Sequence, residues 1–327
     1  MDVTVSLHNL SDDEMKFVKQ IGVDYVDVHP YALGFQPLNL KDAAMIIRKI
    51  REAGLKVLSY RLGPTALRDA LMAKPEGEKQ LEAVCELLRF LGSESVPLTW
   101  FGAGDTIRQG PRGVPGRYRR AHRGGYIMDA FSLELMRKEM VERDMSARWA
   151  HHFKEKLTPE DYFSNYVKVL EKIVPVAEES NVKLMSPFDD PPVPNFEGLL
   201  PGITNTVMIR RLLEAAPSKN WGMLFCVGTR YESGEDVYQQ IRLLGNKIFY
   251  VHFRNVRGTL PSTGEYEEVS LDDGDMDMFR VLKTLKEVGY EGALHPDHTP
   301  IMIEDEKGRA SLAFAVGYIK ALISVLS

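Results

Sequence analysis

Cysteine is scarce in this chain, because only 2 of its 327 residues, Cys85 and Cys226, are cysteine. Two cysteines do not make the disulfide framework on which small secreted proteins depend. The first ten residues, MDVTVSLHNL, also lack the basic segment and apolar core of a secretory signal. We therefore expect a cytoplasmic protein.

Long apolar runs and an excess of positive charge are missing as well. No uninterrupted run of about 18 apolar residues is present to span a membrane. The chain has 41 Lys and Arg against 46 Asp and Glu, a formal net charge of −5, which argues against a nucleic-acid partner. The two glycines after Arg123 lack the spacing of a dinucleotide fingerprint. We expect a small-molecule ligand and neither a membrane nor a nucleic acid as partner.

What the sequence does contain is a regular alternation of strand-like and helix-like segments. Each apolar run that predicts a strand is followed by a segment with helical periodicity, and the last helix is predicted over residues 311–325. Eight strands alternating with helices predict a single α/β domain over residues 1–327, built as a (β/α)8 TIM barrel. The predicted strands are residues 3–7, 25–29, 56–60, 97–101, 183–186, 222–228, 247–255 and 292–298.

One stretch is additional to the strands and helices of the barrel. It is a long inserted loop and helical excursion over residues 102–158, after the fourth strand. Because the carboxyl ends of barrel strands form the active face, we expect this excursion to lie over that face. Its arginines either form a lid that binds an acidic substrate through guanidinium–carboxylate pairs, or belong to a solvated or subunit-contacting loop. The arginines of residues 102–126 are Arg108, Arg112, Arg117, Arg119, Arg120 and Arg123.

Three side chains of metal-ligand type stand at the ends of the last three strands: Cys226, His252 and Asp297. Taken singly, each has an ordinary explanation, since a lone cysteine is usually a small core residue and a strand histidine is often only hydrogen-bonded. Parallel strands bring their carboxyl ends to one face, so the three should meet there. Together they predict a site for manganese, iron, cobalt or zinc at the barrel mouth.

From the fifth strand onward the chain resembles the mannonate dehydratase family, which belongs to the xylose isomerase-like barrels. The resemblance is strongest over residues 183–300 and rests on several blocks in order. Members of that family use a divalent metal, often Mn²⁺, to convert D-mannonate into 2-keto-3-deoxygluconate and water. The blocks are Asp189-Asp-Pro-Pro192, Phe225-Cys226-x-Gly228, Val251-His-Phe-Arg-Asn-Val-Arg257, the acidic segment 271–278 and Pro296-Asp297-His298.

The resemblance implies roles for the residues at the barrel mouth. The family's metal ligands fall on Cys226, His252 and Asp297, and the family favours Mn²⁺, with Fe²⁺, Co²⁺, Mg²⁺ or Zn²⁺ as alternatives. His298 matches a histidine implicated in proton transfer, a task suited to a side chain that titrates near neutrality. Alternatively, His298 orients Asp297.

Arg254 is the second residue expected to act in catalysis, because it shares a strand face with His252. It either binds the substrate carboxylate or pairs with the acids at the rim, and the sequence leaves both possibilities open. Further substrate contacts are expected from Asp189, Asp190, His295, Arg123 and Asn255.

The chain also departs from the family pattern at functional positions. Pro187 stands where the family has a metal-ligating histidine, and proline has no side-chain donor. The metal is then held by three protein ligands plus water or substrate, or another group such as Asp189 replaces the histidine, or the site is weakened. His295 replaces a common arginine, and the last helix lacks an expected tyrosine near Ala313.

These observations favour a metal-dependent dehydratase of a sugar acid, with D-mannonate as the first candidate. One alternative is a sugar isomerase or epimerase on the same barrel. Another is a catalytically silent homologue that binds a sugar acid. A homo-oligomer is expected in each case.

Overall fold

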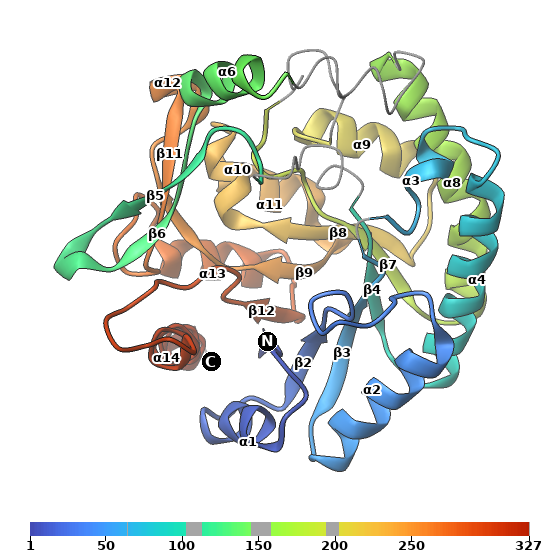
Figure 1. Cartoon of the computed structure of the whole chain (residues 1–327), viewed down its shortest axis with the longest axis horizontal. Helices are drawn as coiled ribbons and strands as arrows, with labels where there is room; N and C mark the ends of the chain where they lie inside the picture. Colours follow the sequence, from blue (N-terminus) through green and yellow to red (C-terminus); the bar gives the residue numbers. More distant parts are fainter. Residues whose placement is uncertain (64, 103–112, 145–157, 194–202, 327) are drawn as a thin grey trace.

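A closed barrel of eight parallel strands forms the centre of the protein (Figure 1). The structure is a computed structural model that describes residues 1–63, 65–102, 113–144, 158–193 and 203–326. Neighbouring strands follow the order β1-β12-β9-β8-β7-β4-β3-β2, so the sequence prediction of a (β/α)8 barrel is confirmed. All eight predicted strands are present, as β1 (Asp2–Ser6), β2 (Tyr25–Val28), β3 (Lys56–Arg61), β4 (Leu98–Trp100), β7 (Lys183–Ser186), β8 (Trp221–Cys226), β9 (Ile248–His252) and β12 (Ala293–His295).

Helices surround the barrel, and local capping signals fix where several of them begin. The Ser11 side chain accepts a hydrogen bond from the Glu14 amide at 3.2 Å and so caps the helix that begins at Asp12. Thr158 and Asp161 form a reciprocal capping box at the start of α8. The helices are α1 (Asp12–Gln20), α2 (Leu40–Glu52), α3 (Arg68–Leu71), α4 (Gly77–Ser93), α6 (Leu133–Glu142), α8 (Pro159–Glu179), α9 (Thr206–Ala215), α10 (Val227–Glu232), α11 (Val237–Leu244), α12 (Leu260–Thr263), α13 (Met278–Glu287) and α14 (Arg309–Leu326).

Polar side chains reach the barrel mouth because strand residues two apart point to the same side. On β8 and β9, the apolar residues Leu224 and Tyr250 belong to one buried cluster. Two positions further on, Cys226 and His252 end these strands and line a pocket. The same spacing therefore fills the barrel with apolar groups and supplies its mouth with reactive ones.

A second, antiparallel sheet lies beside the barrel, with the order β10-β11-β6-β5. It consists of β5 (Arg117–Ala121), β6 (Ile127–Ser132), β10 (Asn255–Arg257) and β11 (Glu265–Val269), and Figure 1 shows the β5–β6 hairpin projecting from the side of the molecule. The sequence analysis treated residues 102–126 as a loop, and this was wrong for β5. The pairing of β6 with β11 joins segments distant in the sequence, so no local pattern reveals it. The predicted lid residues Arg108 and Arg112 lie outside the described residues.

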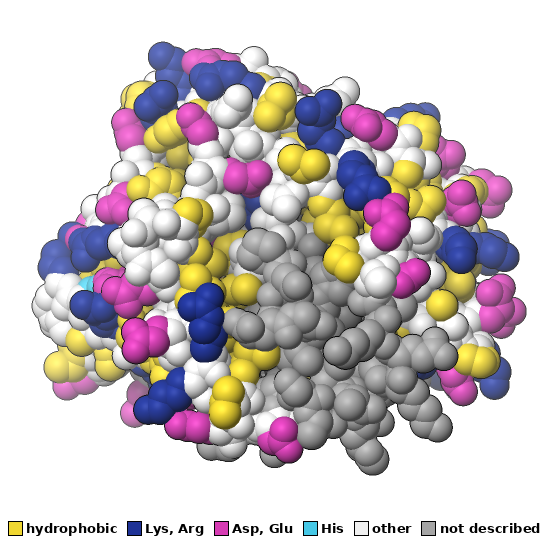
Figure 2. Space-filling view, turned by 90° about the horizontal axis from the view of Figure 1, so that it is seen from above, with side chains coloured by type: hydrophobic (Ala, Val, Ile, Leu, Met, Phe, Trp, Pro, Cys, Tyr) yellow, Lys and Arg dark blue, Asp and Glu magenta, His cyan; other side chains and the backbone are white. Residues whose placement is uncertain are grey.

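Helix α14 is long and apolar enough to cross a membrane when judged by length and composition alone. In the fold it follows the last barrel strand as an outer helix and packs against the barrel along one face. Leu312, Val316 and Ile319 are buried in the main core cluster. On the face shown in Figure 2, basic and acidic side chains are interspersed rather than gathered into fields of one sign.

Candidate metal centre and active site

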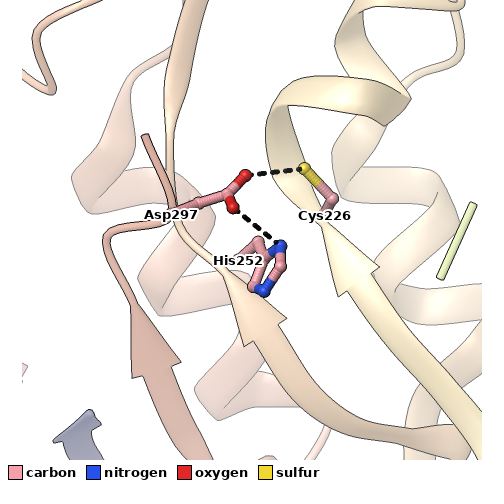
Figure 3. Close-up of side chains that lie close together, drawn as sticks. All are labelled: Cys226, His252 and Asp297. Carbon is pink, nitrogen blue, oxygen red and sulfur yellow. Dashed lines mark hydrogen bonds and ion pairs between the residues drawn. The ribbon is translucent and has the colours of Figure 1, made fainter. Parts of the chain in front are cut away.

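Cys226, His252 and Asp297 converge at the barrel mouth, as the sequence predicts. Their donor atoms all lie within 4.8 Å of one another, and Figure 3 shows the Asp297 carboxylate next to both partners. One carboxylate oxygen lies 3.2 Å from Nδ1 of His252, and the other accepts a hydrogen bond from the Cys226 thiol at 3.9 Å. Asp297 has a φ of 62°, a left-handed conformation that is uncommon for an aspartate and that occurs at functional sites.

The charges around the three residues favour the ligand form of the thiol. Burial alone would raise the pKa of Cys226, but Arg254 and His252 hold it below its ordinary value. Burial likewise opposes ionisation of Asp297, yet His252 and His298 keep its pKa well below the usual range. Asp297 and Cys226 raise the pKa of His252 to about 9 against the effect of burial. A thiol whose ionisation is favoured and a carboxylate thus face a histidine whose proton a metal ion would replace.

The donor set fits a divalent transition metal, because it combines sulfur, nitrogen and oxygen within a buried cluster. Within the described part of the chain, these are the three residues whose ligand atoms come together. Pro187 lines the same pocket and supplies no side-chain donor. Asp190 is engaged by Arg117 at 2.6 Å and by Arg254 at 2.7 Å. Among the described residues, the donors that come together are therefore those of Cys226, His252 and Asp297.

Arg254 is a buried hub of ion pairs. Its guanidinium is 1% exposed and Nη2 lies 2.7 Å from Asp190, so the structure shows the pairing with a rim acid that the sequence left open. Nε donates to Asp297 at 3.0 Å, and Nη1 donates to Glu232 and lies 3.6 Å from Glu268. With these partners Arg254 holds the Asp297 carboxylate in place, which supports a positioning role.

His298 lines the pocket and makes an ion pair with a buried acid. Its Nδ1 lies 2.6 Å from Glu268, and Nε2 lies 3.7 Å from Asp297. Burial would lower the pKa of this histidine, but Asp297 and Glu268 raise it to about 10. Glu268 belongs to β11, so the second sheet supplies a partner to the site.

The residues expected to contact substrate divide into two groups. Asp189, Asp190 and His295 line the pocket. Nδ1 of His295 accepts from the Asp297 amide at 2.8 Å and Nε2 lies 3.1 Å from the Ser6 hydroxyl, while burial and His252 lower the pKa of His295 to about 3. The ring is therefore neutral and oriented, and it supports the unusual backbone of Asp297.

The structure does not bring Arg123 and Asn255 to the pocket. Arg123 is 58% exposed and pairs with Asp272 at 2.8 Å, on the surface. The Asn255 amide donates to the carbonyls of Leu271 and Met276 and so fixes the acidic turn between them. Both side chains therefore contact other segments of the protein, which leaves the prediction of substrate contacts at these two positions without support.

Several pocket residues were missed by the sequence analysis. The cavity measures about 420 Å³, a size typical of small-molecule sites. Its wall opposite the metal ligands comes from β1 to β4 and the segments that follow them. These residues could have been found in the sequence because they stand at or just after the carboxyl ends of the first four strands. The same criterion identified the candidates at the ends of the last strands. The missed residues are Ser6, His8, His29, Arg61 and Trp100.

The fold and the site define a class of protein, a (β/α)8 barrel with a cluster of metal-ligand-type side chains at its mouth. The shape is shared with D-psicose 3-epimerase from Clostridium cellulolyticum H10, with a TM-score of 0.62 and 12% identity over 98% of this chain and 99% of that one. It is closer to mannonate dehydratase from Streptococcus suis serotype 2, with a TM-score of 0.80 and 22% identity over 98% and 93% of the two chains.

Sequence comparison identifies the family. The sequence model of the D-mannonate dehydratase (UxuA) family matches residues 136–326. Mannonate dehydratase of Thermotoga petrophila is 30% identical over 271 residues, which cover 80% of this chain and 67% of that protein. The chain belongs to the D-mannonate dehydratase family, a family of hydro-lyases.

Proposed function

We propose that this protein removes water from a sugar acid, with D-mannonate as the first candidate, and that a divalent metal held by Cys226, His252 and Asp297 assists the reaction. The observation that carries the proposal is the convergence of these three donors on the wall of a pocket that His298 also lines. Family membership supports the reaction class and the sugar-acid substrate. Mn²⁺ is the proposed metal.

A bound metal would supply Lewis-acid stabilisation of the negative charge that develops when the C2 proton leaves. The protein's own residues do the rest. Arg254 fixes Asp297, and the left-handed backbone of Asp297 is held by the hydrogen bond to His295. His298, paired with Glu268, presents a proton-bearing ring to the pocket and is placed to protonate the departing 3-hydroxyl. The resulting enol tautomerises to the 2-keto-3-deoxy acid.

The proposal extends to the organisation of the protein. Residues 1–327 form one domain, with the excursion at 102–158 contributing to the second sheet. A cytoplasmic homo-oligomer is proposed, and exposed apolar side chains on α14, Phe314 at 41% and Val325 at 70%, support such an association. Size-exclusion chromatography with light scattering tests the oligomer, and a monomer at micromolar concentration would contradict it.

The test combines metal analysis with product identification. Purified protein is loaded with Mn²⁺, its metal content is measured, and D-mannonate turnover is followed by detecting a 2-keto-3-deoxy acid. Cys226→Ala and His252→Ala should lose both bound metal and turnover. Cys85→Ala is the matched control, because this half-buried cysteine on α4 lies outside the pocket lining.

Other outcomes would contradict the proposal in distinct ways. An epimer or isomer of the sugar in place of a keto-deoxy acid would assign isomerase chemistry. Thermal stabilisation by D-mannonate without turnover under any divalent metal would assign a binding role. Retention of metal and turnover by both ligand variants would remove the proposed metal centre.

A further inference from the structure

The pocket wall opposite the metal ligands contains a second buried carboxylate with a histidine. Asp27 is fully buried on β2, and one of its oxygens lies 2.8 Å from Nε2 of His29, two residues further along the chain. The other oxygen accepts a hydrogen bond from the Ser59 hydroxyl of β3. The His29 side chain is 23% exposed and lines the pocket. Asp27 is thus fixed by its neighbours and in turn fixes the ring of His29.

This pairing determines which nitrogen of His29 carries the lone pair of the neutral ring. Since Asp27 accepts the proton on Nε2, the neutral ring carries its lone pair on Nδ1. Nδ1 lies 3.5 Å from Nη1 of Arg61, whose guanidinium lies 3.9 Å from the ring centroid of Trp100. A carboxylate that orients a histidine through one ring nitrogen and leaves the lone pair on the other is the usual arrangement of a general base. In His29 that lone pair lies beside the guanidinium that would hold the substrate.

The base and the guanidinium stand across the pocket from the metal ligands. The Trp100 ring lies 5.6 Å from the His29 ring and 6.2 Å from the His252 ring, so both histidines pack against the same indole. Arg61 lines the same cavity. A guanidinium matches a carboxylate in two-pronged geometry, and the carbon bonded to a sugar acid's carboxylate is C2. A carboxylate bound at Arg61 therefore brings the C2 hydrogen to the neighbourhood of His29.

We infer that His29, oriented by Asp27, is the base that removes the C2 proton of the sugar acid, with Arg61 holding the carboxylate beside it. The inference rests on the proposed dehydratase function. In this step the C2–H bond breaks and its proton goes to Nδ1 of His29, while the electron pair becomes the C2=C3 bond. The C3–O bond breaks, and the hydroxyl leaves as water with a proton from His298. His29 then gives its proton to C3 as the enol tautomerises, and the proton lost from the enol hydroxyl restores the one that His298 gave to the leaving water.

The experiment compares His29→Gln and His29→Ala with the wild-type enzyme loaded with Mn²⁺ and supplied with D-mannonate. Both variants should retain wild-type metal content, while kcat falls by about 10²–10⁴-fold. Added imidazole should restore part of the turnover of His29→Ala, a rescue that a purely structural histidine would not show. Arg61→Met should instead raise KM for the acid. His122→Gln, in the turn between β5 and β6 and outside the pocket lining, is the matched control and should keep kcat.

The outcomes separate this inference from the proposed function. An active wild type whose His29→Gln variant keeps kcat within about threefold would overturn the assignment of His29 and leave the dehydratase intact. Loss of activity in His29→Ala without imidazole rescue would also reject His29 as the base. A wild type that makes no keto-deoxy acid would remove both the function and the inference.

Discussion

Replacing Arg254 by Met should destabilise the protein by about 3–5 kcal/mol, because it removes the positive charge from a buried cluster of acids. The guanidinium is 1% exposed, and its partners Glu232 and Glu268 are 0% and 2% exposed. Methionine retains much of the side-chain volume, so lost packing contributes little. Asp190 and Asp297 each lose a partner as well, at 2.7 Å and 3.0 Å.

The size of the effect can be expressed as a melting temperature. An unfolding entropy of about 2.1 cal/mol/K per residue gives about 0.7 kcal/mol/K for the whole chain, so Tm should fall by roughly 4–7 °C. Burial raises the pKa of Glu232 well above its ordinary value even beside Arg254, so protonation of this acid limits the loss. Adding Glu232→Gln to Arg254→Met should therefore recover part of the stability.

Differential scanning calorimetry of the metal-free protein at pH 7 measures the difference. Arg119→Met is the control, because Arg119 is 70% exposed and its Nε lies 3.8 Å from Asp129. That change should cost less than about 0.5 kcal/mol. If Arg254→Met melted within about 1 °C of wild type, the buried acids would not depend on this guanidinium and the reasoning would be refuted.

Two further predictions concern the same cluster. Gly228→Ala would place a Cβ 2.7 Å from Nη1 and 2.8 Å from Cζ of Arg254, so the free energy of unfolding measured in urea should fall by about 1–3 kcal/mol. Gly317→Ala is the control, because a Cβ at that position meets no atom within 4 Å, and it should not lower the free energy of unfolding. Arg117 and Arg254 lower the pKa of Asp190 to about 2 against burial. The stabilisation, about 2 kcal/mol, is therefore complete above the unfolded value near 4 and lost as pH falls through 2. Stability of the metal-free wild type should approach that of Asp190→Asn between pH 5 and pH 2, and a constant difference would count against the pairing.

The barrel could be predicted from the sequence because its strands and helices are encoded locally. Each strand is a short apolar run, and Ser11 and similar caps mark where helices begin. Convergence of Cys226, His252 and Asp297 follows from the same reasoning, since each ends a strand of one parallel barrel. The local sequence pattern was sufficient to predict the location of a residue wherever that location depends only on its position along its own strand or helix.

The remainder depends on contacts between distant segments. The pairing of β6 with β11 leaves no local trace, and the arginine-rich β5 lacks the apolar alternation of a strand. The roles of Arg254 depend on Glu232 and Glu268, which arrive from separate elements. His29 and Arg61 did stand at strand ends, but their significance depends on the burial of Asp27, which spacing alone does not reveal.

The second sheet has a consequence for protein engineering. Two adjacent strands, β5 and β6, come from the excursion after β4, and the other two, β10 and β11, come from the segment after β9. The sheet delivers Arg117 to Asp190 and Glu268 to His298. Exchanging only the β5–β6 hairpin with that of another barrel would leave β11 with an unpaired edge and Asp190 without one of its cations. The two segments therefore form one transferable unit, and a chimera that changes substrate preference must exchange both together.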